Sequence, residues 1–303
     1  MKESTPLSGL WCATLTPLGQ HLGIDQPRLA SHVNGLLAEG VDGVVLFGTM
    51  GEGPSFSVAE RCAGLDGLLA AGTPAQRMVT ATGCAALRDT VTLTRHSLQA
   101  GCPRCLILPP FFWKDLSDEG VFRYYASLID EVDDPRLRLY LYHIPQLSAV
   151  PIRPEAVTRL AAAYPGIVAG VKDSSGDFAH TAALLECAPQ LAILGGDEPQ
   201  LPQLMRAGGA GTICGLANLA PSVTAALLRP DVDQEAVNGV QTFLDIVLRY
   251  PLVPAFKAVY AAQTGDDAWR AVRLPLLPLT EAEYQALFLS LAEAGFDVSG
   301  VAE

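Results

Sequence analysis

Lys172 is the residue of this chain whose surroundings most favour covalent chemistry. It ends the run Ile167-Val-Ala-Gly-Val-Lys172 and is followed by Asp173, two serines and Gly176. β-Branched and small residues in a run are typical of a buried strand, so a lone cation stands at a strand's carboxyl end. Burial disfavours the ammonium form, and a neutral lysine amine can attack a ketone to give a Schiff base. The alternative is a lysine that closes the strand and pairs with Asp173.

Two other apolar runs also end in groups suited to catalysis. The turn Gly48-Thr-Met-Gly-Glu52 offers backbone N–H groups and the Thr49 hydroxyl, which could hold a small anion such as a carboxylate. Tyr142 ends a second run, and a tyrosine there could transfer a proton. His143 should face the opposite side of that strand, so we expect it to be structural. The alternatives are an ordinary glycine turn and a packed aromatic ring.

A further pair of acids follows the run that ends in Gly195. In Gly195-Gly-Asp-Glu198, Asp197 and Glu198 could accept hydrogen bonds from sugar hydroxyls, or could cap the next helix near Pro199. Cys102-Pro-Arg-Cys105 has a spacing found in redox and metal sites. One cysteine pair cannot fill a tetrahedral site, however, and we expect no bound metal.

The elements that carry these groups repeat as a strand followed by a helix. Strands are expected at 10–16, 43–48, 78–82, 105–109, 137–144, 167–172, 191–195 and 211–215. Helices are expected at 26–38, 58–71, 86–100, 118–131, 154–164, 178–187, 199–207 and 221–228. Eight such units without a polar linker indicate an α/β fold, a (β/α)8 TIM barrel, in which catalytic residues gather at the carboxyl ends of the strands. A doubly wound open sheet is the alternative, but no Gly-x-Gly-x-x-Gly follows the first strand.

The barrel is expected to occupy residues 1–230. Residues 231–303 are expected to form a C-terminal helical extension packed on the barrel, with helices near 234–249, 254–264 and 281–294.

Composition excludes several classes of function. Half of the 303 residues are hydrophobic and 17% are charged, so the chain has a sizeable core. A net charge of −12 without a basic run argues against nucleic acid, and no apolar stretch is long enough to cross a membrane. The start of the chain lacks the pattern of a secretory signal, and seven scattered cysteines fit reduced thiols. We therefore expect a cytoplasmic protein.

Three motifs together resemble those of the dihydrodipicolinate synthase / N-acetylneuraminate lyase family. They are Gly48-Thr-Met-Gly-Glu52, Tyr142-His-Ile-Pro145 and Gly170-Val-Lys-Asp-Ser-Ser-Gly-Asp177. The likeness runs over nearly the whole chain and ends with Gly208–Asn218 and Arg273-Leu-Pro-Leu. The resemblance implies a (β/α)8 barrel with C-terminal helices and a class I aldolase mechanism. It implies no metal and no cofactor other than a covalent lysine Schiff base with the substrate. It also implies a homotetramer built from two tight dimers.

The resemblance assigns roles to individual residues. Lys172 would be the Schiff-base lysine, Tyr142 the general acid and base, and Thr49 with the Met50 backbone the holder of the substrate carboxylate. The other residues expected to bind substrate are Gly48, Gly51, Ser174, Gly195, Asp197, Glu198 and Ile213.

Departures from the family pattern point toward its lyase branch. Met50 stands where a second hydroxyl residue is usual, and Phe112 stands where the synthases carry a tyrosine that reaches into the neighbouring subunit. Leu147 replaces the arginine that grips a second carboxylate in the synthases, which argues against lysine biosynthesis. Asp197 and Glu198 match acids that contact the polyhydroxylated tail of sialic acid in the lyases, although Cys214 stands where a serine is expected.

The expected function is therefore a Schiff-base lyase that acts on a 2-oxo acid. It would cleave or form a 2-oxo-3-deoxy sugar acid, or a related pyruvate adduct, giving pyruvate and an aldehyde. A 2-oxo-3-deoxy-acid dehydratase or a hydratase-aldolase is the alternative within the class, and the aromatic residues 111–113 could widen the pocket for an aromatic aldehyde or plug a subunit interface. A binding protein without turnover is a third possibility, because Met50 and Phe112 remove relay groups. A phosphate-binding barrel is disfavoured by the two acids at Asp197 and Glu198.

Overall fold

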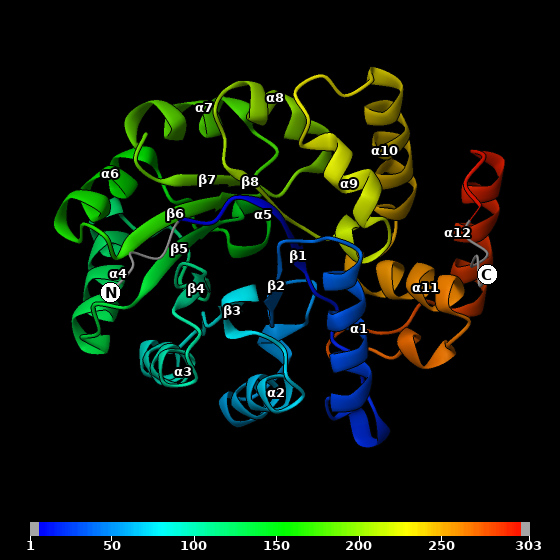
Figure 1. The fold of residues 1–303 in the computed structure, drawn as a ribbon, viewed down its shortest axis with the longest axis horizontal. Coiled ribbons are helices and arrows are strands. Elements are labelled where there is room, and N and C mark those ends of the chain that lie inside the picture. Colours follow the sequence, from blue (N-terminus) through cyan, green and yellow to red (C-terminus); the bar gives the residue numbers. More distant parts are fainter. Residues whose placement is uncertain (1–5, 298–303) are drawn as a thin grey trace.

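Eight parallel strands close into a barrel in the computed structural model, which describes residues 6–297 (Figure 1). The strands are β1 (Gly9–Ala13), β2 (Gly43–Leu46), β3 (Met78–Ala81), β4 (Arg104–Ile107), β5 (Arg138–His143), β6 (Val168–Asp173), β7 (Ala192–Gly195) and β8 (Gly211–Cys214). The surrounding helices are α1 (Gln26–Ala38), α2 (Val58–Ala70), α3 (Leu87–Gln99), α4 (Asp118–Val132), α5 (Pro145–Ser148), α6 (Pro154–Ala163), α7 (Phe178–Cys187), α8 (Leu201–Arg206) and α9 (Pro221–Leu227). The predicted (β/α)8 TIM barrel is confirmed.

Local signals set most of the element boundaries. Asp25 and Ser117 accept N–H groups at the starts of α1 and α4, and Ser57 forms a reciprocal capping box with Glu60 at the start of α2. β1 ends at Ala13, three residues earlier than predicted. The reason is that the N–H of Leu15 donates to the Asn218 side chain at 3.0 Å.

One predicted helix differs from the structure in detail, and one short helix was not predicted. The predicted helix 199–207 is a 3-10 turn, Glu198–Gln200, followed by α8. The short α5 was not predicted at all. It is a single turn that begins at Pro145, and such a turn is too short to show an apolar period.

The strand period of two places alternate residues inside the barrel. Tyr140 lies at the amino-terminal end, where its hydroxyl accepts the N–H of Leu7 at 2.8 Å. Gly170 leaves room for that ring, since a Cβ there would lie 2.8 Å from it and 2.4 Å from the carbonyl oxygen of Ala192. One step further along the same face, Tyr142 of β5 is the register partner of Lys172 of β6. Barrel closure therefore brings these two side chains together.

The C-terminal helices lie along one side of the barrel (Figure 1). They are α10 (Gln234–Val247), α11 (Leu252–Thr264) and α12 (Glu281–Glu293). α10 packs against α9 and against the 3-10 turn Glu198–Gln200, so the extension reaches the carboxyl ends of the strands. The division of the chain at residue 230 stays a prediction. Within residues 6–297, every helix is too short or too polar to cross a membrane.

We predict that Gly170→Ala lowers the free energy of unfolding by about 1–3 kcal/mol, because the added methyl group must displace Tyr140 or the β7 backbone. Urea unfolding followed by circular dichroism measures the change. Gly35→Ala is the matched control. Gly35 lies in α1 with open space at its Cβ position, and this substitution should raise stability by roughly 0.5–1 kcal/mol. Equal stability of wild type and Gly170→Ala would contradict the packing described.

Candidate active site

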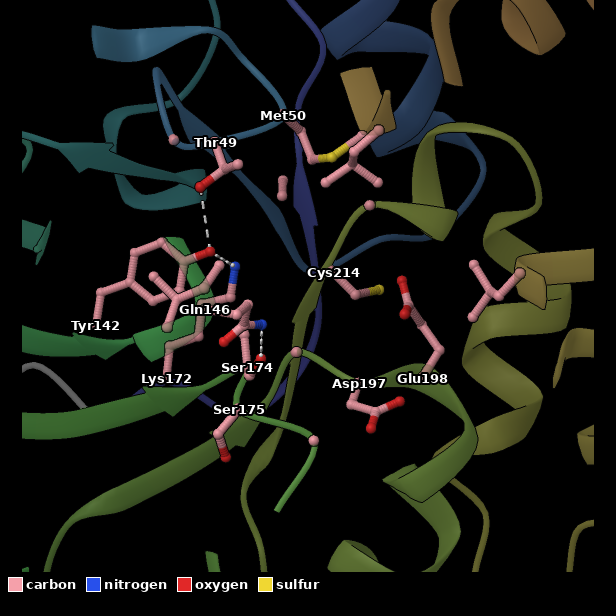
Figure 2. A pocket seen from close by; sticks show the side chains of 18 of the residues that line it. Thr49, Met50, Tyr142, Gln146, Lys172, Ser174, Ser175, Asp197, Glu198 and Cys214 are labelled. Atoms are coloured by element: carbon pink, nitrogen blue, oxygen red, sulfur yellow. Dashed lines mark hydrogen bonds between the residues drawn. The ribbon is translucent and has the colours of Figure 1, made fainter. Parts of the chain in front are cut away.

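A cavity of about 390 Å³ opens at the carboxyl ends of the strands (Figure 2). Its lining includes eight of the residues expected from the sequence: Gly48, Thr49, Met50, Tyr142, Lys172, Ser174, Asp197 and Glu198. Three other expected residues, Gly51, Gly195 and Ile213, are buried but do not line the cavity. Their roles in binding stay predictions.

Lys172, Tyr142 and Thr49 form a hydrogen-bonded chain on one side of the cavity (Figure 2). The Lys172 Nζ lies 3.2 Å from the Tyr142 hydroxyl oxygen, which lies 3.3 Å from the Thr49 Oγ1. Lys172 is 5% exposed and forms none of the ion pairs found among the described residues. Asp173 points to the opposite face of β6, so the alternative of a Lys172–Asp173 pair is wrong.

The turn after β2 presents unused backbone donors. No hydrogen bond among the described residues uses the N–H groups of Thr49, Met50 or Gly51. The residues on either side of this turn, Phe47 and Glu52, adopt left-handed backbone conformations with φ of 58° and 55°. Such conformations are costly for residues other than glycine, and they are retained at sites that the surrounding structure holds firmly. The turn therefore presents three unused backbone donors from which a small anion could accept hydrogen bonds.

Asp197 and Glu198 lie on the side of the cavity opposite Tyr142 (Figure 2). Burial raises the pKa of both carboxyl groups. Glu198 Oε1 accepts the N–H of Leu216 at 3.1 Å, so its side chain supports the loop after β8 and does not cap the helix near Pro199. Among the described residues that line the cavity, Lys172 alone is cationic.

Several residues of the cavity were missed by the sequence analysis. Gly196 is the clearest case, because a Cβ there would lie 1.9 Å from the Ser174 Oγ and 3.0 Å from the Lys172 Cε. α10 and α11 also contribute to the wall, with Gln241, Leu244, Leu248, Leu252 and Phe256. The apolar period of these helices was visible in the sequence, but it does not show which surface they pack against.

Comparison with known proteins identifies the family. The model of the dihydrodipicolinate synthetase family matches residues 6–294. The chain belongs to this family. Members are lyases of the aldolase type, so the chain has a lyase fold.

Three relatives illustrate the range of similarity. The chain is 36% identical over 284 residues to an uncharacterized DapA-like lyase of Chloroflexus aurantiacus, covering 92% of this chain and 94% of that protein. A crystal structure of dihydrodipicolinate synthase from Agrobacterium tumefaciens has a TM-score of 0.90 and 33% identity, covering 95% of this chain and 99% of that one. A variant of 2-keto-3-deoxygluconate aldolase from Sulfolobus solfataricus has a TM-score of 0.83 and 19% identity, covering 94% and 95%. The last similarity shows the fold alone.

The residues that depart from the family pattern differ in whether they line the cavity. Met50 fills part of the cavity beside Gly215, where a Cβ would lie 3.2 Å from its sulfur. Phe112, Trp113 and Leu147 are exposed and do not line the Lys172 cavity. The aromatic residues 111–113 therefore do not shape this cavity, and the interface role considered for them stays a prediction.

Asp173 anchors the outer face of β6 through an ion pair with His180 of α7. The His180 Nδ1 lies 2.7 Å from Asp173 Oδ2, and its Nε2 lies 3.0 Å from the Ile152 carbonyl oxygen. Both ring nitrogens therefore face acceptors, an arrangement that favours the doubly protonated form of His180. His143 stacks on this ring at 4.0 Å and its Nδ1 accepts the N–H of Ile152, so its predicted structural role is confirmed.

These contacts set the protonation states of the network. Burial works to raise the pKa of Asp173, but hydrogen bonds from His180 and Ser175 lower it to about 2. Burial works to lower the pKa of His180, but its hydrogen bond to Asp173 raises it above the usual value. Burial and the nearby His180 charge lower the pKa of His143 to about 4.

We predict that Asp173→Asn destabilises the protein most between about pH 4 and 6.5. The Asp173 contribution is present above its unfolded pKa of about 4 and is lost as the pH falls toward 2. The His180 contribution is complete below its unfolded pKa of about 6.5 and is lost as the pH rises through the higher folded value. Urea unfolding at pH 5.5 should show a loss on the order of 2 kcal/mol that shrinks by pH 9. A loss that grows with pH would contradict the ion pair.

Proposed function

We propose that this protein is a class I Schiff-base lyase that cleaves or forms a 2-oxo-3-deoxy sugar acid, or a related pyruvate adduct, to give pyruvate and an aldehyde. The observation that carries this proposal is the contact of the Lys172 Nζ with the Tyr142 hydroxyl, 3.2 Å apart in a cavity where Lys172 alone among the described lining residues is cationic. A buried amine beside a phenol supplies both the nucleophile and the proton carrier that this reaction needs.

The reaction begins at the ketone of the substrate. The neutral amine of Lys172 attacks C2, and loss of water leaves an iminium that withdraws electrons from C3. Tyr142 then takes the proton of the C4 hydroxyl while the C3–C4 bond breaks. The aldehyde leaves, and the bonding electrons form an enamine of pyruvate on Lys172. Protonation at C3 and hydrolysis of the resulting iminium release pyruvate and restore the amine.

The turn after β2 is suited to hold the substrate carboxylate. The Thr49 hydroxyl and the N–H groups of Met50 and Gly51 are the proposed donors. Two or three such donors on one carboxylate fix the ketone carbon in front of Lys172, which lowers the entropic cost of attack. The arrangement favours 2-oxo acids over simple ketones.

The far side of the cavity favours an uncharged, hydroxylated aldehyde half. Asp197 and Glu198 can accept hydrogen bonds from hydroxyl groups, and the pKa of each is raised by burial. A phosphate or a second carboxylate would meet these acids without a compensating cation among the described lining residues.

The same iminium supports β-elimination of water, so a 2-oxo-3-deoxy-acid dehydratase remains the alternative within the class. A binding protein without turnover is the alternative outside it. The homotetramer and the absence of a metal are carried as family expectations, and the cytoplasmic location as an expectation from the sequence composition.

We predict that borohydride traps a pyruvate adduct on the wild type and none on Lys172→Ala, because the adduct requires the Lys172 imine. Intact mass spectrometry followed by peptide mapping measures it. Tyr142→Phe should still form the adduct but should lower kcat by about 10²–10⁴-fold, since general acid–base catalysis is lost. An adduct on neither protein would contradict the aldolase proposal and favour a binding protein without turnover. An adduct on Lys172→Ala would show that another amine forms the imine.

We also predict that kcat/KM for an unphosphorylated 2-oxo-3-deoxyhexonate exceeds that for its 6-phosphate by about 100-fold or more, a difference of about 2.7 kcal/mol. The reason is that the described residues lining the cavity offer no cation other than Lys172 to a phosphate beside Asp197 and Glu198. A coupled assay of pyruvate release compares the two substrates. The double substitution Asp197→Asn and Glu198→Gln should reduce the ratio of the two kcat/KM values, because it removes both negative charges. Equal kcat/KM values of the wild type on both substrates would contradict the proposed preference for an uncharged aldehyde half.

A further inference from the structure

A fully buried ion pair joins the C-terminal extension to the turn that carries Thr49 and Met50. Glu52 follows that turn directly, and its Oε1 lies 2.5 Å from the Nζ of Lys257 in α11. Both side chains have no exposed surface. The two residues are 205 positions apart in the chain, so the contact depends on how the extension packs on the barrel.

Each partner is also tied to the extension or the turn by other hydrogen bonds. Glu52 Oε2 accepts the N–H of Arg273 at 2.7 Å, and Lys257 donates to the carbonyl oxygen of Ala271 at 2.8 Å. The N–H of Glu52 donates to the carbonyl oxygen of Thr49 at 3.1 Å. Both oxygens of the Glu52 carboxylate are held by hydrogen bonds. The side chain can therefore fix the position of the Glu52 backbone, to which the turn is hydrogen-bonded at Thr49.

The conformation of Glu52 requires such an anchor. Its backbone is left-handed, with φ of 55° and ψ of 29°. The next residue, Gly53, packs so closely that a Cβ there would lie 1.7 Å from the Phe47 carbonyl oxygen. A turn with this backbone persists only where neighbouring contacts hold it. Within the core, the Thr16 hydroxyl donates to the Gly51 carbonyl oxygen at 2.8 Å, and the side chain of Glu52 provides the charged contact.

Stability alone does not account for this pair. Burying two charges costs several kcal/mol in desolvation, and apolar residues of similar volume often serve stability as well or better. Burial lowers the pKa of Lys257, which shows the cost on the lysine side. A buried pair with little net stabilisation is better explained by the geometry that it specifies.

We propose that Glu52 and Lys257 are positioning residues that hold the unused N–H groups of Thr49, Met50 and Gly51 in place for the substrate carboxylate. The C-terminal extension thereby takes part in recognition of the 2-oxo acid through Lys257, in addition to lining the cavity with Leu252 and Phe256 of the same helix. This inference rests on the proposed function, because it assigns the turn to a carboxylate.

The test compares two probes of the same amine. Pyruvate carries a carboxylate and hydroxyacetone does not, yet both ketones can form an imine with Lys172 that borohydride traps. Glu52→Gln should raise the half-saturating concentration of pyruvate about 10-fold or more. It should change the limiting trapping rate and the half-saturating concentration of hydroxyacetone by less than about 3-fold.

Glu60→Gln is the matched control. Glu60 pairs with the Arg273 side chain at 2.7 Å, so it joins the same extension to α2 without touching Glu52. This variant should bind pyruvate as the wild type does. The double variant Glu52→Gln and Lys257→Met removes both charges and leaves no unpaired buried ion, so it should stay folded and show the same loss for pyruvate even where the single variant does not fold.

Three results would overturn the inference. The first is an unchanged half-saturating concentration of pyruvate in the folded Glu52 variants. The second is an equal rise in the half-saturating concentration of hydroxyacetone, and the third is an equal rise for pyruvate in Glu60→Gln, because both indicate general loosening of the fold. Failure of the proposed function looks different, since the wild type itself would then form no pyruvate adduct.

Discussion

Closure of a parallel barrel forces the inward side chains of neighbouring strands into one shared space at its mouth. Tyr142 and Lys172 are partners in the β5–β6 register, so the amine and the phenol meet because the strands pair, without any contact between distant loops. The same alternation sends the next residues, His143 and Asp173, outward toward α7. A one-residue slip of β6 would turn Lys172 to the outer face and remove the amine from the cavity.

That constraint also explains what could be predicted from the sequence. The period-two pattern and the strand ends were sufficient to place Tyr142 and Lys172 together, and the Gly48–Glu52 turn beside them. They were not sufficient for Gly196, whose importance depends on its distance from the Lys172 Cε across two strands. Nor could they show that α10 faces the cavity, because an amphipathic helix has an apolar side whatever it packs against.

Two departures from the family pattern, Met50 and Cys214, lie in the same part of the cavity wall. Met50 is larger than a hydroxyl residue, and its side chain occupies the space beside Gly215. Cys214 lines the same region, and burial beside Glu198 raises the pKa of its thiol to about 12, so it stays neutral. This part of the wall is consequently less polar than the family pattern would make it, while the Met50 N–H is kept.

The charged residues around the cavity differ in whether they have a partner in an ion pair. Asp173 is neutralised by His180 outside the barrel, and Glu52 is neutralised by Lys257 behind the turn. Lys172 forms no ion pair within residues 6–297, and its charge acts on Glu198 only across the cavity. In the proposed reaction the positive iminium and the carboxylate of the same substrate then balance each other. A simple ketone would form an iminium without this counter-charge, so under the proposed mechanism Lys172 and the turn after β2 would select 2-oxo acids together, and neither would do so alone.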